Sequence, residues 1–379
     1  MTREELRAAM DDVIYCCACM VNGEKPDAAR AAGMEPEAMY PAAKRHQLAG
    51  IVGCALEAAG VYDPAFRQEK AKAVRKIVLL DAERAAVLAE LEKAGIWYLP
   101  LKGCVLKDLY PAVGMRQMAD NDILIDASRC EEVRKIMESL GFETGNFGKG
   151  NHDSYFRPPV SRFEMHRALF SESLGGELYE YYRNVKDRLI KDEGNSFGFH
   201  FSPEDFYVYL IAHEYKHFSN SGTGLRSILD TYVYLQNVPL DMDYVAGETD
   251  TLGIAGFEAA NRSLAQHLFG GEELTDEDRE MLEYILSSGT YGTLQNRVKN
   301  KIAKNGGSRS RYMLQRLCVP VSPKDPNYQA YAAAFPRFYK NKLLLPLLPV
   351  YRACRAMKNG RLRTELRAVA RVHKKSTNG

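Results

Sequence analysis

Hydrophobic spacing divides the chain into helical regions at both ends and a strand-like region between them. Up to residue 95, apolar side chains recur three and four positions apart, as in KAVRKIVLLDAERAAVLAELEKAG, which is typical of amphipathic helices. Gly95 fits the end of the last of these helices. The same spacing returns from Pro203 in PEDFYVYLIAHEYKHF and LRSILDTYVYLQ. We therefore expect an N-terminal helical region (1–95) and a helical domain (201–305).

The middle of the chain has the pattern of a small α/β unit. Branched and aromatic residues in IWYLPLKG predict a strand that leads into a Lys-Gly turn, and a short helix follows as far as Pro111. NDILI predicts a second strand, SRCEEVRKIMESLGF a helix, and DSYFRPP and SRFEMHRAL two more strands joined at Pro158-Pro159. The expected fold class is α+β, with a small mixed sheet within 96–200 and a partly helical tail over 306–379.

Composition sets wide limits, and charge adds one local feature. The 379 residues, 46% hydrophobic and 26% charged with a net charge of +2, suffice for a buried core and indicate no strongly charged partner. Residues 352–375 hold nine Lys or Arg against one acid, Glu365. Leu362, Leu366 and Val369 would share one side of a helix there, which predicts weak contact with a membrane surface or nucleic acid. The alternative is a charged helix that packs back on the fold.

The expected compartment is cytoplasmic. Eight cysteines without a regular framework favour reduced thiols in a chain of this length. The first residues place acids before a short apolar run, unlike a secretory leader. The apolar stretch LLLPLLPVY is too short, and too interrupted by proline, to span a bilayer.

The stretch HEYKH matches the HExxH signature of zinc hydrolases. His213 and His217 would lie on one helix face, and Glu214 could act as general base to a zinc-bound water. Lys216 places a cation inside the motif, and no third histidine follows at the metzincin spacing. A zinc-dependent hydrolase stays an alternative, beside the interpretation that these histidines pack between helices.

Three carboxylates form a second candidate site. Asp120 and Asp122 are two positions apart at the start of the strand NDILI, so both should project from one face. Glu164, in the strand SRFEMHRAL, is the candidate third acid and shares its strand face with His166. Paired carboxylates bind hard cations through oxygen. We predict Asp120, Asp122 and Glu164 as metal ligands and catalytic residues, although Asp-Asn-Asp is also an ordinary turn sequence.

The turn before these acids predicts a phosphate site. Gly103 follows a strand and opens a helix, so backbone N–H groups there can approach an anion. Lys102 would add a positive charge, and Arg116 lies in the loop just before the acid pair. We predict Lys102, Gly103 and Arg116 as nucleotide-binding residues, with a simple turn or helix cap as the alternative.

The order LPLKG, LYP, an Arg, DxDILI and later E-x-H resembles the uncharacterised nucleotidyltransferase family of the DNA polymerase β-like superfamily. That family also tends to carry H-x-x-K-H in a later helix, followed by an Arg and an Asp. The corresponding residues here are His213, Lys216, His217, Arg226 and Asp230. Glu214 then fills a variable position. The resemblance covers about 96–240, with two departures, Asn121 between the acids and Cys104 after the glycine.

The resemblance implies a polymerase β-like nucleotidyltransferase core that transfers an NMP from an NTP to a hydroxyl and releases pyrophosphate. It implies Mg²⁺ or Mn²⁺ as cofactor, and it leaves the acceptor open among a small molecule, a sugar, a protein and an RNA. His166, Lys216 and His217 would line the acceptor side, with core packing or salt bridges as the alternative. A non-catalytic or antitoxin-like nucleotide-binding protein on the same scaffold is a further alternative.

Overall fold

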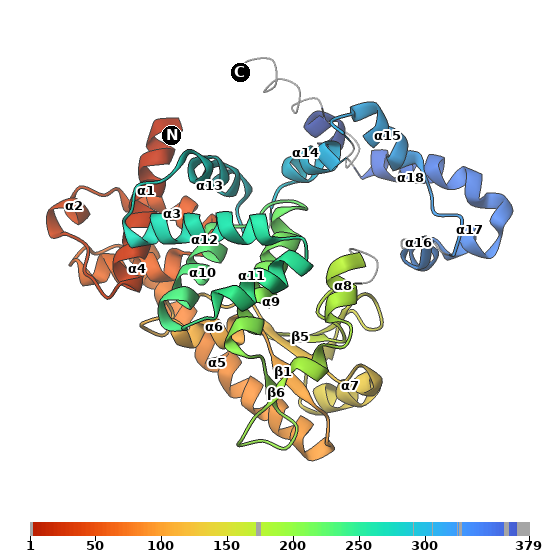
Figure 1. The fold of residues 1–379 in the computed structure, drawn as a ribbon, viewed down its shortest axis with the longest axis horizontal. Helices are drawn as coiled ribbons and strands as arrows, with labels where there is room; N and C mark the ends of the chain where they lie inside the picture. Colours follow the sequence, from red (N-terminus) through yellow and green to blue (C-terminus); the bar gives the residue numbers. More distant parts are fainter. Residues whose placement is uncertain are drawn as a thin grey trace.

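The computed structural model describes residues 3–171, 176–290, 292–304, 306–323, 325, 328–359 and 364–369. Figure 1 shows a small sheet below a layer of helices, with the last helices forming a lobe at the upper right. This arrangement confirms the predicted α+β class, a small mixed sheet flanked by N-terminal and C-terminal helices.

The helices before the sheet end in one long helix. They are α1 (Arg3–Val21), α2 (Ala28–Ala32), α3 (Pro36–Arg45), α4 (Ala49–Ala58) and α5 (Pro64–Ala94). Asp63 caps α5 by accepting a hydrogen bond from the Phe66 N–H at 2.8 Å. Gly95 ends it in the left-handed conformation, at φ +66°, where glycine is favoured. This turn sends the chain directly into the first strand.

The sheet is mixed, and a parallel pair lies at its centre. Its strands are β1 (Tyr98–Pro100), β2 (Asn121–Ile125), β3 (Glu143–Thr144), β4 (His152–Arg157) and β5 (Ser161–His166). Their order is β1-β2-β5-β4-β3, with β2 and β5 parallel and the other pairs antiparallel. The connections between them include α6 (Gly103–Leu106) and α7 (Cys130–Ser139). A two-stranded ribbon of β6 (Ile190–Lys191) and β7 (Phe199–His200) follows α8 (Gly176–Tyr182).

The helices after the sheet begin with α9 (Pro203–Phe218), which packs on one of its faces. It is followed by α10 (Leu225–Asn237), α11 (Met242–Thr251), α12 (Ala255–Gly270) and α13 (Asp276–Ser288). Ser202 caps α9, and Thr275 and Asp278 form a reciprocal capping box at the start of α13. Helix α9 supplies buried residues to a core that includes Leu124 of β2. Helix α9 therefore packs against the sheet face that carries Leu124.

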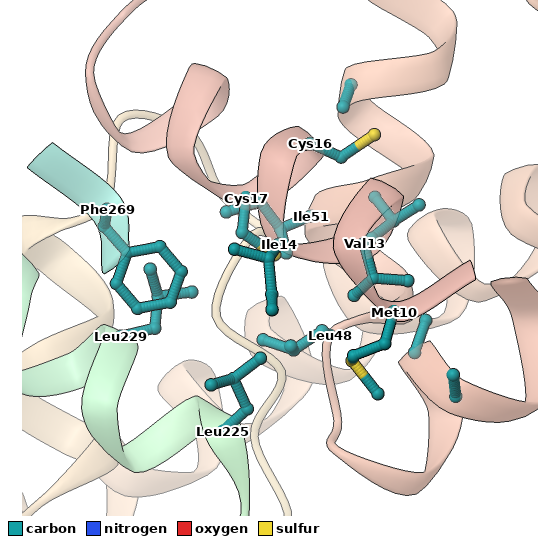
Figure 2. Packing of buried hydrophobic residues seen from close by; sticks show 14 of the residues in the cluster. Met10, Val13, Ile14, Cys16, Cys17, Leu48, Ile51, Leu225, Leu229 and Phe269 are labelled. Atoms are coloured by element: carbon teal, nitrogen blue, oxygen red, sulfur yellow. The ribbon is translucent and has the colours of Figure 1, made fainter. Parts of the chain in front are cut away.

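The N-terminal helices and the helices after the sheet share one core, although they lie far apart in sequence (Figure 2). The core includes Val13, Ile14 and Cys17 of α1, Ile51 of α4, Leu225 and Leu229 of α10, and Phe269 of α12. Burying a large aliphatic side chain contributes about 1.5–3 kcal/mol. Helices α1, α4, α10 and α12 are therefore held together as one packed unit.

The two faces of the sheet have different neighbours, and this difference positions the acids. Ile123 and Ile125 of β2 pack in a core with residues of α5 and α7. Leu124, between them, packs on the opposite side with α9. Because side chains alternate along a strand, Asp122 shares the face of Leu124. The carboxylate therefore points away from α5 and α7, toward α9.

The C-terminal lobe includes α14 (Leu294–Lys304), α15 (Arg309–Leu317), α16 (Tyr328–Ala334), α17 (Pro336–Lys340) and α18 (Leu348–Lys358), and residues 364–369 are also helical. Val369 is buried against α14 and α15, and Leu366 is exposed. Leu362, the third residue of the predicted tail stripe, lies outside the described residues. Within the described part of the chain, no helix is long and apolar enough to cross a membrane.

Candidate functional site

The two predicted acidic positions meet across the parallel pair of strands. Asp122 of β2 is directly opposite Glu164 of β5 in the register. Asp120 lies one residue before β2, and its charge interacts with those of Asp122 and Glu164. The parallel register therefore places Asp122 beside Glu164, and Asp120, just before the strand, lies near enough for its charge to interact with both.

The pKa of Asp120 reflects the negative charge of the neighbouring carboxylates. Burial, together with the nearby carboxylates of Asp122 and Glu164, raises the pKa of Asp120 to about 6. Lys102 and Arg162 oppose this shift without cancelling it. A bound cation would favour the ionised form of Asp120, because an opposite charge nearby stabilises a carboxylate.

Asp122 is already held by two partners. Its Oδ1 accepts a hydrogen bond from Lys102 Nζ at 2.8 Å and lies 2.7 Å from His166 Nε2. Burial tends to raise the pKa of Asp122, but Lys102 and the His166 hydrogen bond outweigh it and hold the pKa below its usual range. Asp122 is therefore ionised at neutral pH, and its orientation is fixed before any ligand arrives.

The predicted phosphate turn lies beside Asp122. Lys102 adopts a positive φ of +48°, and Leu101 donates its N–H to the Asp122 carbonyl at 2.9 Å. A Cβ on Gly103 would come within 2.5 Å of both Arg116 Nη1 and Met118 Sδ. Only glycine therefore fits at this position, and the reason is close packing beneath the turn.

Arg116, predicted as a nucleotide-binding residue, is engaged elsewhere. Its Nε and Nη2 each donate to Asp230 of α10 at 2.8 Å, and both side chains are only 6% exposed. Tyr110 donates a further hydrogen bond to Asp230 at 2.7 Å. The guanidinium therefore anchors the loop before β2 to α10, and we do not place it among the phosphate contacts.

One face of α9 adds three further predicted residues. The Nε2 atoms of His213 and His217 lie 3.3 Å apart. Burial lowers the pKa of Lys216, while the charges of Asp122 and Glu164 tend to raise it, so its ammonium lies near the acid cluster. Burial, with Lys216 and Lys102, lowers the pKa of His217 to about 4. His217 is therefore a neutral imidazole at pH 7.

The hydrolase interpretation of HEYKH fails because Glu214 points the other way. It is buried between helices and accepts a hydrogen bond from Asn261 Nδ2 of α12 at 2.7 Å. Burial, followed by the charge of Asp230, raises its pKa well above the usual range. A side chain buried on the far face of α9 cannot serve as general base to a water held by His213 and His217.

Asn121 and Cys104, the two departures from the family pattern, are accommodated beneath the sheet. Asn121 donates to the Leu80 carbonyl of α5 at 2.9 Å and accepts from Arg84 at 3.0 Å. The Cys104 thiol lies 3.4 Å from the Asn121 side-chain oxygen. The buried amide expected to need a partner is satisfied, and both residues lie outside the acid cluster.

Similarity to known proteins identifies the family of this chain. The family model "Uncharacterised nucleotidyltransferase" matches residues 32–270, more than half of the chain. The chain belongs to this family. A search of curated proteins found no match. The crystal structure of an antigenic nucleotidyltransferase-like protein from Paracoccidioides brasiliensis is similar at 16% identity and a TM-score of 0.33, over 50% of this chain and 92% of that chain.

His152 is a site residue that the sequence did not reveal. It begins β4 opposite His166 in the register, and its Nε2 lies 3.6 Å from Glu164 Oε2. The polar/apolar alternation of DSYFRPP predicted a strand here, but it could not show which residues of the neighbouring strand would lie opposite. In this member of the nucleotidyltransferase family, a histidine therefore lies beside the carboxylates Glu164 and Asp122.

Proposed function

We propose that this nucleotidyltransferase depends on Mg²⁺ or Mn²⁺ and transfers an NMP from an NTP to a hydroxyl of its acceptor. The proposal is supported chiefly by the pKa of Asp120, which burial, Asp122 and Glu164 raise to about 6. A cluster of acids that is only partly neutralised is a favourable place for divalent cations. We propose Asp120, Asp122 and Glu164 as the metal ligands.

The reaction in this proposal is an in-line displacement at the α-phosphorus. The acceptor oxygen forms a bond to phosphorus, the bond to the bridging oxygen breaks, and pyrophosphate leaves. Divalent cations held by the three acids would neutralise the phosphates and polarise the acceptor hydroxyl. Positioning and charge neutralisation by the protein then account for most of the acceleration.

Lys102 and Gly103 are the proposed contacts to the triphosphate. Burial tends to lower the pKa of Lys102, but the Asp122 carboxylate outweighs it and raises the pKa above its usual value. Lys102 therefore stays charged beside the acids. Because its side chain is 20% exposed, the ammonium can also reach a phosphate oxygen. Gly103 lets the backbone come close to the same anion.

The proposed acceptor side is the α9 face with Lys216 and His217. A neutral His217 can take the proton of the acceptor hydroxyl, and Lys216 can orient an anionic or polar acceptor. His166, also predicted on the acceptor side, contacts Asp122 directly at 2.7 Å. We therefore propose His166 as a residue that orients the carboxylate.

The test is a screen of the four labelled NTPs with Mg²⁺ or Mn²⁺ against cell extract. The double variant Asp120→Asn/Asp122→Asn should lose transfer of label. Asp126→Asn, at the other end of β2, is the matched control and should retain it, since Asp126 only caps the following turn. Binding of NTP without transfer would instead support the non-catalytic alternative, and neither binding nor transfer would overturn the proposal.

A further inference from the structure

Two histidines and one carboxylate converge beside the acid pair. Among the described residues, the ligand atoms of His152, Glu164 and His166 all lie within 4.8 Å of one another. His166 Nε2 is 4.0 Å from Glu164 Oε2, and the two imidazole rings are 5.2 Å apart. The three residues come from β4 and β5, so the sheet fixes their spacing.

His166 has unused bonding capacity. It is 4% exposed, and its Nδ1 has no hydrogen-bond partner in the described structure. When Nε2 donates its proton to Asp122, the lone pair of the ring lies on Nδ1. A buried imidazole that is only half satisfied is expected to have a further partner.

The three residues offer two imidazole nitrogens and one carboxylate oxygen, whereas a site built from acids alone offers only oxygen. Imidazole nitrogen favours transition ions such as Zn²⁺ and tolerates Mn²⁺, whereas Mg²⁺ prefers oxygen ligands and retains its waters. We propose that His152, Glu164 and His166 bind a first-row transition ion next to the Asp120/Asp122 position. This inference rests on the proposed function for its role, since the ion would be the second cation of the same site.

Electron paramagnetic resonance of bound Mn²⁺ tests the proposal without any turnover. The wild-type protein should show ¹⁴N coupling from imidazole in pulsed spectra, and His152→Ala should weaken Mn²⁺ binding at least tenfold and reduce that coupling. His200→Ala, a histidine on the β6–β7 ribbon, is the matched control and should change neither. His152→Gln is a second variant in case the alanine variant does not fold.

The outcomes separate this inference from the proposed function. Mn²⁺ that binds without ¹⁴N coupling, or equally well after His152→Ala, overturns the histidine site even if NMP transfer is observed with Mg²⁺. Nitrogen-coupled Mn²⁺ in a protein that transfers no nucleotide supports the site and contradicts the proposed function.

A second, independent feature lies in the C-terminal lobe. An exposed stripe continues from the 3₁₀ turn Lys342–Leu347 into α18, at a spacing of three or four residues. It consists of Leu343, Leu347, Val350, Cys354 and Met357, and we call it the α18 stripe. Leu343 is 87% exposed and Val350 62%. Side chains of this type on one helix face usually have a partner.

Charge around the α18 stripe indicates what that partner is. Residues 326–364 contain eight Lys or Arg and no Asp or Glu. Two copies of the chain that met through this stripe would bring like charges together, which opposes self-association. An anionic bilayer would receive the apolar side chains and attract the cations at the same time. An apolar stripe also suits a bilayer better than RNA, which is bound mainly through phosphate contacts and stacking.

We propose that the α18 stripe docks the protein peripherally on an anionic lipid surface. The full chain should co-sediment with vesicles of phosphatidylcholine plus phosphatidylglycerol, and at least tenfold less with phosphatidylcholine alone. Leu343→Glu/Leu347→Glu should abolish the binding. Leu314→Glu, an equally exposed change on α15, is the matched control and should preserve it.

Three results would overturn the lipid proposal. They are equal binding to both vesicle types, dimerisation in solution that Leu343→Glu/Leu347→Glu reverses, and RNA binding in the absence of vesicle binding. Circular dichroism of the double variant checks that it folds, which its exposed positions lead us to expect.

Discussion

Arg116 and Asp230 form a buried two-point ion pair across 114 residues of sequence, with both N–O distances at 2.8 Å. The pair joins the loop before β2 to α10, and Arg226 of α10 also donates to the Gln117 carbonyl of that loop at 3.1 Å. The acid pair follows this loop directly. Two residues of the family pattern, Arg226 and Asp230, therefore hold in place the loop that precedes the proposed metal ligands.

Breaking this pair should be costly. Asp230→Ala leaves the Arg116 guanidinium buried and unpaired, so we expect the free energy of unfolding to fall by about 3–5 kcal/mol in urea titrations. Lys93→Ala, which removes a solvent-exposed pair with Glu90 within α5, is the control and should cost less than about 1 kcal/mol. A similar small loss for both variants would contradict the anchoring role.

Asp120→Asn should stabilise the protein while it removes activity. The pKa of Asp120 is about 6 in the folded state, above the reference value of 3.8. Between these two pH values, the folded state therefore retains a proton on Asp120 that the unfolded state has lost. The contribution of Asp120 to the free energy of unfolding should therefore fall as pH rises from about 4 to about 6, whereas His46 and His217, with pKa values lowered to about 4, contribute in the opposite direction. In chelator at pH 7, we expect a gain of about 1–3 kcal/mol for Asp120→Asn.

Unfolding curves from pH 4 to 7 measure the Asp120 effect. The free energy of unfolding of Asp120→Asn relative to that of the wild type should rise between about pH 4 and about pH 6, whereas Asp126→Asn should follow the wild type. An unchanged slope in Asp120→Asn would mean that the carboxylate is not destabilised by its neighbours, which would remove the main support for a cation there.

Gly103→Ala should be destabilising for a steric reason. Its Cβ would lie 2.5 Å from Arg116 Nη1, and Arg116 is fixed by Asp230. We expect a loss of about 1–3 kcal/mol in thermal or urea unfolding. Gly247→Ala is the control, because nothing lies within 4 Å of its added Cβ and it is inside α11, so it should stabilise by about 0.5–1 kcal/mol.

Glu214→Gln should retain nucleotidyl transfer. Glu214 faces away from the acids, burial raises its pKa, and glutamine of the same shape keeps an oxygen that can accept the hydrogen bond from Asn261. Since the native carboxyl must ionise in a buried place as pH rises, the variant should be more stable than the wild type at pH 9. Loss of activity, together with stoichiometric zinc in the purified protein, would revive the hydrolase interpretation.

Local patterns in the sequence determined the elements of the site. Strand alternation predicted that Asp120 and Asp122 project from one face, and it places Asp122 on the face of Leu124, because the side-chain period of a strand is a local property; Asp120 lies one residue before the strand. Glu164 followed as the third acid from the E-x-H strand, and Gly103 from the junction of strand and helix. The resemblance of the LKG, DxD and HxxKH order was sufficient to identify the family that the comparison confirms.

Only the tertiary structure decided which of these residues face one another. The roles of Arg116 and Asp230 depend on a contact between α10 and a loop far away in sequence. The β4–β5 register places His152 opposite His166, and the orientation of α9 about its axis points Glu214 toward α12. A one-residue shift in strand register would move His152 to the other face of the sheet, and a rotation of α9 would bring Glu214 toward the acids. Register and helix orientation are determined by packing over the whole core.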